Sequence, residues 1–434
     1  MKTNYLNPKK NCPSIILFLL LIVGINQSAL AFFQENPQDY VQYTGEVLDN
    51  ESNKPVTSAI LSINNTNIST ITNGEGEFLL KVPANNIDNS VTISSLGYIT
   101  KNIPLSEFKP EDYSIKLNPS VIELSEVDVE VPKDAAALVK KTLQRKGENN
   151  VNDHLLMTAF YRETIKRRNR NVSLAEAVVS VYKKPYSSLQ KDDIEMYKSR
   201  KSTDYKRLDT VAVKLQGGPF NPLYGDLMKY PEYMFSSGLI DDYSFSIDQS
   251  TVINNKHVYV VNFKPLPGIV EPRYYGKLFI DSGNLALVSA SYNLNVENED
   301  LASELFVRRR PNGIKVYPTE AMYKVDYREK DGRWYYGYSN ISLTFKINDK
   351  KKIFNTVYTV TSEMAVTDWE KNEDLENLKP KVQLRPSVVI SDEASGFSDP
   401  EFWGSHNVIE PEKSIETAIN KIKRRLDRTD SNGN

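Results

Sequence analysis

Cysteine is almost absent from this sequence of 434 residues, and its absence limits both stabilisation and chemistry. The only cysteine is Cys12, which lies in an N-terminal segment that we expect to be removed. The remaining chain can therefore form no disulfide, and it has no thiol for nucleophilic catalysis. Its stability must come from ordinary hydrophobic cores, and the chain is long enough to form two or three of them.

The signatures of common enzyme families and a basic charge excess are also missing. The sequence contains no Gly-x-Ser-x-Gly, no phosphate-binding loop and no glycine-rich dinucleotide fingerprint. The formal net charge is −2, whereas nucleic-acid-binding domains are usually strongly basic. We therefore expect no nucleic-acid partner, and no pattern in the sequence predicts a cofactor.

The N-terminus has the three-part pattern of a secretory signal. Basic residues precede an apolar run over 15–23, and Ala29 and Ala31 supply the small side chains that signal peptidase requires. We predict a signal peptide over 1–31, cleaved after Ala31, and export from the cytoplasm. The run is shorter than the roughly 20 apolar residues of a membrane span, and an uncleaved N-terminal anchor is the alternative.

Residues 39–120 contain short strand-like segments separated by Gly and Asn turns. Apolar side chains alternate with others over 59–63 and dominate 78–82, and the turn 73–76 lies between these segments. Strands at this regular spacing predict an antiparallel β-sandwich of the prealbumin or immunoglobulin-like kind.

The same segment resembles a known domain family. The motifs that carry the resemblance are Gly45-x-Val47-x-Asp49, Lys54-Pro55-Val56, Ala59-x-Leu61-x-Ile63, the run from Thr70 to Pro83, and Ser94-Ser95-Leu96-Gly97-Tyr98. They are similar to the carboxypeptidase-regulatory-like domain, a prealbumin-like sandwich of envelope proteins of the Bacteroidetes type. Asn73 stands where this family usually has Asp. In the family such modules act as spacers or docking elements.

The resemblance implies no peptidase activity. A zinc carboxypeptidase binds its metal with two histidines and a glutamate, usually including a His-x-x-Glu pair. The three histidines of this chain are His154, His257 and His406, and none is followed by Glu at that spacing.

Beyond the sandwich the pattern changes twice. We predict a linker with a short helix over 121–153, in which Asp134 is the N-cap. A large curved antiparallel sheet with a few helices follows over 154–390. Many of the 25 tyrosines lie in these strands, and such a stripe is more often a core face than a ligand platform. A curved sheet with a tyrosine-lined concave face also resembles the half-barrels that carry lipids or apolar molecules in bacterial envelopes.

Several further segments resemble uncharacterised envelope proteins that carry the same sandwich. These segments are Gly217-Gly218-Pro219-Phe220-Asn221-Pro222, Asp226-Leu227-Met228-Lys229-Tyr230-Pro231, Tyr161-Arg162-Glu163 and Phe402-Trp403-Gly404. The resemblance then covers most of the mature chain, but it implies no activity.

Acidic residues leave a glycan or peptide hydrolase open as an alternative. Two glycosidase carboxylates must lie roughly 5–10 Å apart across the sugar, and adjacent acids in polar stretches are more often solvated loop charges. The acids in question are Asp192 and Asp193, Asp241 and Asp242, and Glu297 with Glu299 and Asp300. One local group has metal-ligand chemistry, namely Asp399, Glu401, His406 and Glu410. We predict neither a catalytic residue nor a metal site from these patterns.

The C-terminal part supplies a candidate partner surface and a helix. Basic clusters on a net-negative protein are usually solvated turns, and they can alternatively bind anionic envelope polymers or lipid phosphates. The candidate surface consists of Arg308, Arg309, Arg310, Phe402 and Trp403. Over 391–434 we predict a loop and an amphipathic helix whose apolar face includes Ile415, Ile419 and Leu426. We expect this helix to dock on the large domain, and a partner- or membrane-binding arm is the alternative.

These observations favour an exported, non-catalytic protein of the cell envelope, in the periplasm or associated with the outer membrane or cell surface. It would bind a ligand or partner or act as a scaffold, with no transmembrane span in the mature chain. The alternatives are a glycan or peptide hydrolase and a periplasmic lipid or lipoprotein carrier of the half-barrel type. A filled sheet face would favour scaffolding, an apolar cavity would favour the carrier, and a cleft with converging carboxylates would favour the enzyme.

Overall fold

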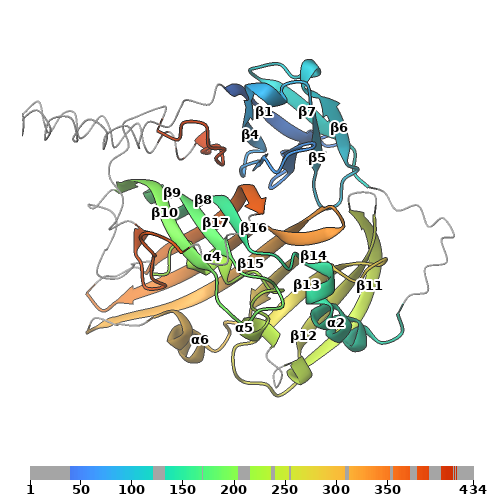
Figure 1. Ribbon diagram of the computed structural model, residues 1–434. Helices are drawn as coiled ribbons and strands as arrows, with labels where there is room; N and C mark the ends of the chain where they lie inside the picture. Colours follow the sequence, from blue (N-terminus) through green and yellow to red (C-terminus); the bar gives the residue numbers. More distant parts are fainter. Residues whose placement is uncertain are drawn as a thin grey trace, which may run out of the picture. The chain divides into compact units, whose positions relative to one another are not determined.

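The computed structural model describes residues 40–120, 132–168, 170–203, 216–235, 240–253, 256–307, 312–351, 355–371, 379–390, 402–413, 415 and 417. Within these ranges the chain is mainly β, with two small sheets followed by one ten-stranded sheet (Figure 1). The predicted mainly-β class, a sandwich followed by a large antiparallel sheet with a few helices, is confirmed, whereas most of the predicted C-terminal helix lies outside the described residues. The domain boundary near residue 120 stays a prediction, because 121–131 lies outside the described residues. No helix in the described ranges is both long and apolar enough to cross a membrane.

The sandwich consists of a three-stranded sheet in the order β4-β1-β7 and a four-stranded sheet in the order β3-β2-β5-β6. The antiparallel prediction is wrong for one pair, because β1 runs parallel to β7. Leu61, Ile63, Val91 and Ile93 point into the core, and the residues between them face outward. This alternation follows from the two-residue period of a strand. The strands are β1 (Tyr40–Asp49), β2 (Ile60–Ile63), β3 (Ser69–Ile71), β4 (Glu77–Pro83), β5 (Ser90–Ser94), β6 (Lys101–Pro104) and β7 (Tyr113–Leu117), with 3-10 turns η2 (Ala84–Asn86) and η3 (Leu105–Glu107).

One glycine in the sandwich is required by a close approach. Gly76 has a φ of +76°, and a Cβ there would lie 2.8 Å from the carbonyl oxygen of Val47. The turn over 73–76 that the sequence predicts therefore depends on a residue without a side chain at this position.

The ten-stranded sheet is antiparallel throughout and has the order β10-β9-β8-β17-β16-β15-β14-β13-β12-β11. Two meanders, β8 to β10 and β11 to β17, are joined where β17 pairs with β8. β8 and β9 form an antiparallel pair. The strands are β8 (Leu155–Arg167), β9 (Arg170–Lys183), β10 (Asp193–Thr203), β11 (Tyr243–Ile253), β12 (Lys256–Pro265), β13 (Tyr274–Asp281), β14 (Leu287–Leu294), β15 (Ile314–Lys330), β16 (Arg333–Asp349) and β17 (Thr356–Lys371).

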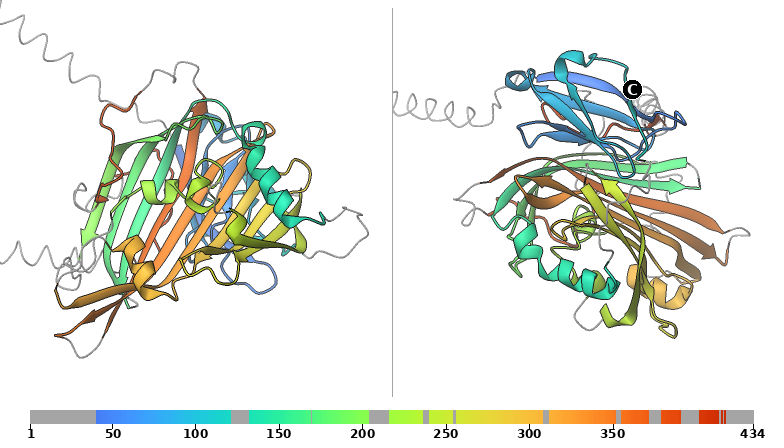
Figure 2. Two further views of the ribbon diagram at one scale, coloured as in Figure 1. Left: turned by 90° about the horizontal axis from the view of Figure 1, so that it is seen from below. Right: turned by 90° about the vertical axis from the view of Figure 1, so that its right-hand side faces the viewer.

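The sheet is curved, and its helices lie on the concave side (Figure 2). α2 (Ala135–Gln144) packs beside β11, α4 (Phe220–Leu223) lies against β16 and β17, and α6 (Glu299–Phe306) contacts β15. The remaining short helices are α3 (Lys146–Asn149), α5 (Glu232–Phe235) and η4 (Ile240–Asp242). The predicted N-cap of α2 is confirmed, because Asp134 accepts a hydrogen bond of 2.9 Å from the backbone N–H of Ala137.

Both faces of the central strands are buried. In β8, Met157, Ala159 and Tyr161 join the concave core. Phe160 and Arg162, which follow Ala159 and Tyr161, are buried on the opposite face. A strand that is covered on both sides loses the simple alternation of apolar and polar residues. This double burial creates two separate environments in which charged groups are enclosed.

Candidate functional site

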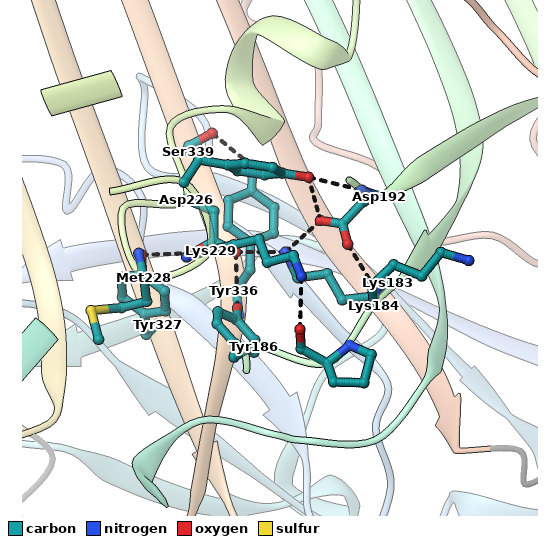
Figure 3. A network of polar contacts seen from close by, with 12 residues as sticks. Lys183, Lys184, Tyr186, Asp192, Asp226, Met228, Lys229, Tyr327, Tyr336 and Ser339 are labelled. Atoms are coloured by element: carbon teal, nitrogen blue, oxygen red, sulfur yellow. Dashed lines mark hydrogen bonds and ion pairs between the residues drawn. The ribbon is translucent and has the colours of Figure 1, made fainter. Parts of the chain in front are cut away.

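The concave side encloses a lysine between two carboxylates (Figure 3). Lys183, the last residue of β9, donates to Asp192 Oδ2 at 2.7 Å and to Asp226 Oδ2 at 2.6 Å. The side chain of Lys183 is 1% exposed, and those of both carboxylates are 0% exposed. Burial alone would lower the pKa of Lys183, but the two carboxylates outweigh it and the net direction is upward. Lys183 is therefore held as a cation.

Tyrosine hydroxyls supply further donors to the same carboxylates. Tyr186 and Tyr327 donate to Asp226 at 2.9 and 2.8 Å, and Tyr230 donates to Asp192 at 2.8 Å. Burial, followed by the nearby carboxylates, raises the pKa of each of these tyrosines. They remain neutral donors, and the three hydroxyls together compensate the second negative charge of the cluster.

A second lysine fixes the turn that follows β9. Lys229 Nζ donates to the backbone carbonyls of Pro185 at 2.7 Å and Ser188 at 2.9 Å. Burial lowers the pKa of Lys229 to about 8. Its hydrogen-bond partners are neutral carbonyls, and although the charges of Asp192 and Asp226 raise the pKa, they do not outweigh burial and the nearby Lys183.

The chemistry of this cluster is structural rather than catalytic. A general acid or base must reach a substrate directly or through one water, whereas Lys183 and its two carboxylate partners are inaccessible and mutually paired. The contacts join three parts of the chain: the turn 184–192, the segment 216–235 and the sheet. The cluster therefore fastens two loops to the concave face.

The opposite face carries a second enclosed set of charges. Arg162 pairs with Glu176 at 2.7 Å and with Glu363 at 3.8 Å, and Arg200 pairs with Glu176 at 2.8 Å. Burial raises the pKa of Glu363, and Arg162 opposes that rise. The two arginines and two glutamates balance in charge, in contrast to the single lysine of the concave cluster.

Residues 402–413, which we name the strap, cover this second set of charges. Arg162 donates to the carbonyl oxygens of Ile409 at 2.5 Å and Glu410 at 3.2 Å. Apolar strap side chains pack into one cluster with both modules. That cluster contains Ile71 of the sandwich, Phe160, Val178, Tyr338 and Ala365 of the sheet, and Trp403, Val408 and Ile409 of the strap.

The strap also covers the open side of the sandwich, where β3 and β4 are edge strands. The amide of Asn407 bridges the backbone of Lys81 in β4, accepting from its N–H at 2.7 Å and donating to its carbonyl at 3.2 Å. Thr70 of β3 donates to the carbonyl of Val408 at 3.2 Å. The strap thus satisfies backbone groups that an edge strand would leave unpaired.

Asn73 illustrates why a local departure from the family pattern matters here. Its Oδ1 accepts from the N–H groups of Glu75 and Glu77, both at 2.9 Å, so the turn keeps its hydrogen bonds. Its Nδ2 donates to the strap carbonyl of Glu410 at 3.1 Å. An aspartate has no donor for that carbonyl, so the amide adds a bond to the strap beside those that Lys413 makes to Glu75 and Glu77.

Two cations of β15 hold the sandwich directly. Arg328 donates to Ser69 Oγ and, at 2.8 Å, to the carbonyl of Val366. Lys330 donates to the carbonyl of Thr66 at 3.0 Å and to Asn67 Oδ1. Burial lowers the pKa of Arg328 to about 10, still well above neutrality. The sandwich and the sheet are therefore joined by apolar packing, the strap and these donors.

Of the predicted partner surface, only the aromatic pair lies in described residues. Trp403 is 4% exposed and packs edge-on against Phe160, with ring centroids 5.4 Å apart, while Phe402 is half-buried. Their place on a partner surface stays a prediction. Phe402 is more exposed than Trp403 and is therefore the better placed of the two to contact a partner. Arg308, Arg309, Arg310, Ala29 and Ala31 lie outside the described residues.

The acidic pairs do not gather around one site. Asp192 is buried in the concave cluster, while its neighbour Asp193 pairs with Lys184 at 3.6 Å. The other acids pair separately: Asp241 with Lys140, Asp242 with Arg273, and Glu299 and Asp300 with Lys315. Glu299 and Asp300 belong to the first turn of α6 rather than to a loop. Within the described ranges no three His, Cys, Asp or Glu side chains could hold a metal ion.

The Lys183 cluster was missed by inspection of the sequence. Its one local signal is a lysine at the end of an apolar strand, Val178 to Tyr182, where a charge is unexpected. Asp226 and Lys229 lie in a segment whose unusual composition was noticed, but their partners are about 40 residues away in sequence.

Comparison with known proteins identifies one part of the chain. Residues 43–129 match the family model of the CarboxypepD_reg-like domain, which confirms the predicted domain. No curated protein matches the chain.

Three solved structures are similar over about half of the chain at low scores. A domain assigned to an outer membrane lipoprotein-sorting protein from Vibrio parahaemolyticus shares 10% identity over 56% of this chain and 94% of its own, with a TM-score of 0.26. A DUF1329 family protein from Desulfovibrio piger shares 11% over 56% of this chain and 95% of its own, with a TM-score of 0.24. Lipovitellin shares 8% over 54% of this chain and 27% of its own, also with a TM-score of 0.24. Scores this low support no functional conclusion.

Proposed function

We propose that this protein is an exported, non-catalytic protein of the cell envelope, in which the ten-stranded sheet is a scaffold that presents the sandwich. The observation that carries this proposal is the filling of both faces of the central strands by the chain itself. The concave face is packed with its own loops and helices, and the opposite face is packed with the strap and the sandwich. The buried carboxylates are neutralised by partners within the chain, which disfavours the hydrolase alternative.

The scaffold proposal requires the sandwich and the sheet to behave as one body. Calorimetry of the mature chain should give one unfolding transition, because the apolar cluster shared by both modules couples them. Two well-separated transitions would contradict the proposal, since they would mean that the sandwich is a free module.

Export and the signal peptide belong to the same proposal. Ala29→Leu combined with Ala31→Leu should block processing, because signal peptidase accepts only small side chains there. The precursor should accumulate at its full length when followed by immunoblotting. Normal maturation of this variant would refute the assigned cleavage site.

A second candidate, the lipid or lipoprotein carrier, is favoured by one specific observation. On the concave face near α6, apolar side chains that are only half-buried surround Leu294, Ala321 and Leu343. We name this group the α6 cluster; its half-buried members are Tyr274, Val296, Phe306, Tyr323, Ile341 and Phe345. Half-exposed apolar groups on a curved face suit an acyl chain.

The carrier candidate is tested with the fluorescent apolar probe 1-N-phenylnaphthylamine. Ile341→Glu, in the α6 cluster, should lower probe binding about tenfold, because it places a charge among apolar side chains. Ser342→Glu is the matched control, since the next residue of the same strand points to the other face. Equal binding by both variants and the unmodified chain would reject the carrier.

A further inference from the structure

A single turn projects an apolar side chain away from the protein. Leu189, in the turn that follows β9, is 96% exposed and is the most exposed large apolar residue among those described. An isolated exposed leucine is ordinary on a protein surface. What distinguishes this one is the set of contacts that holds its turn in place.

The turn is fixed by hydrogen bonds at both of its ends and by the side chain of Lys229. Lys184 N–H donates to Asp192 Oδ1 at 2.7 Å, which closes the turn. Lys229 holds the carbonyls of Pro185 and Ser188, as described above. The N–H of Gln190 donates to Ser188 Oγ at 3.1 Å. These bonds fix the backbone on both sides of Leu189, whose side chain lies in solvent.

Amphipathic side chains surround the base of this turn. Lys191 Nζ lies 5.7 Å from the centroid of the Tyr224 ring, and the Tyr224 and Tyr233 rings lie 5.2 Å apart. Tyr233 is 44% exposed and Tyr224 is half-buried. Tyr224 also packs edge-on against Tyr230, whose hydroxyl binds Asp192. The two rings are thus fastened to the same buried cluster as the turn.

This combination matches the chemistry of a membrane interface. Tyrosines are enriched at the level of lipid headgroups, where one end of the ring is apolar and the other is wet. A lysine can keep its ammonium among the headgroups while its stem lies along apolar surface. A projecting leucine enters the acyl region, whereas a sugar ring stacks on a flat aromatic face and would be obstructed by it.

We propose that Leu189, Lys191, Tyr224 and Tyr233 form a membrane-contact site for a lipid surface that contains anionic headgroups. The buried Lys183 cluster preorganises this site by fixing the turn 184–192 and the segment 216–235 on one side of the sheet. The inference rests on the envelope location in the proposed function. It does not depend on whether the α6 cluster binds a ligand.

The lack of cysteine in the mature chain makes a direct test possible. Gln190→Cys, at an exposed position next to Leu189, is labelled with the environment-sensitive fluorophore NBD. With vesicles of phosphatidylethanolamine and phosphatidylglycerol, the emission should shift to the blue and increase. A label at Glu111→Cys, an exposed position on the sandwich, should not respond. An unchanged emission at Gln190→Cys would overturn the proposal.

Unlabelled variants test which side chains bind the vesicles in a sedimentation assay. Leu189→Ser should lower the vesicle affinity about tenfold, because it removes one buried leucine from the bilayer. Ile99→Ser, which changes an isoleucine that is 51% exposed on the sandwich, should leave the affinity unchanged. Lys191→Gln should lower the affinity about fivefold on anionic vesicles and have no effect on purely zwitterionic ones.

Two further outcomes would overturn the proposal. Equal losses in Leu189→Ser and Ile99→Ser would show nonspecific adsorption. Sedimentation with peptidoglycan sacculi in preference to vesicles would show that the Leu189 turn binds glycan instead of lipid. Because vesicle binding is measured on purified mature protein, its failure leaves the export prediction intact. Failure of export, in turn, leaves the measured affinity intact.

Discussion

The two faces of the large sheet enclose charges in different ways. On the concave side, one cation, Lys183, lies between two carboxylates, and all three side chains are at most 1% exposed. On the opposite side, two arginines and two glutamates balance each other, and Arg200 and Glu363 keep 14% and 18% exposure. The first set is covered by loops adjacent to its own strands. The second is covered by the strap, which lies more than 200 residues after Arg162, Glu176 and Arg200 in the sequence.

This difference predicts how each face responds to damage. Removing the cation of the concave cluster would leave two buried carboxylates without a counter-charge, which is among the most costly single changes in a protein. Removing one arginine on the opposite face would leave a partly solvated cluster that still contains a cation. The concave face should therefore be sensitive to single residues, and the opposite face to loss of the strap.

Loss of the strap is expected to have the largest effect. Truncation after Ser398 removes Trp403, Val408 and Ile409 from their shared cluster and should lower the free energy of unfolding by about 5 kcal/mol. Denaturant unfolding measures this change.

Truncation after Thr417 is the control, because it keeps the strap and removes residues 418–434, which carry Ile419 and Leu426 of the predicted C-terminal helix. Equal losses of stability in the two truncations would show that the strap contributes little. The position of Ile415, which is buried, favours the internal docking predicted for this segment.

The second largest effect is expected at Lys183. Lys183→Met should lower the free energy of unfolding by about 3–5 kcal/mol, because it leaves Asp192 and Asp226 buried without a cation. Lys184→Met changes the adjacent lysine, whose ion pair with Asp193 spans 3.6 Å, and should cost less than about 1 kcal/mol. Similar losses of unfolding free energy in the two variants would show that the buried cation of the concave face contributes no more than an ordinary ion pair.

A smaller effect is expected at Arg200. Arg200→Met removes one charge-assisted bond to Glu176 and should cost about 1.5–3 kcal/mol, because Arg162 remains to balance that carboxylate. Chemical denaturation alongside Lys183→Met gives the comparison directly. A loss of unfolding free energy as large as that of Lys183→Met would show that the charges on this face are as fully shielded from solvent as those on the concave face.

The smallest effect is a pH dependence from Lys229. Its pKa of about 8 in the folded state lies below the roughly 10.4 of an unfolded lysine, so the unfolded chain binds more protons between these values. Stability from this group therefore rises with pH over that window. The stability of the unmodified chain relative to Lys229→Met should be greater at about pH 9.5 than at pH 7. A difference in the free energy of unfolding between the two chains that stays constant with pH would contradict the lowered pKa.

Local features of the fold were predictable because they depend on neighbouring residues. Asp134 caps α2 through a bond to a residue three positions away. Asp281 closes the turn after β13 by accepting from the N–H of Gly283 at 2.7 Å. The alternation in the sandwich strands identified its core residues. The pairing of β8 with β17 was not predicted, because about 200 residues separate their partners.

The candidate site shows the same division. The unusual segment 226–231 was visible in the sequence, and so was the aromatic pair Phe402 and Trp403. Neither pattern indicated that Asp226 lies beside Lys183, or that Trp403 lies between two modules. Adjacent acids such as Asp192 and Asp193 look alike in sequence, yet one is buried in a cluster and the other forms an ordinary ion pair.

The sequence by itself determined the mainly-β class, the carboxypeptidase-regulatory-like sandwich and the absence of a thiol or disulfide after the first residues. These properties follow from side-chain period, turn residues and composition, which act over a few positions. Only the tertiary structure decided which charges are enclosed, which edge strands the strap covers, and which leucine is held in solvent. Burial and pairing of this kind are set by contacts between residues 40 to more than 300 positions apart, and a linear pattern does not encode the distance between such residues.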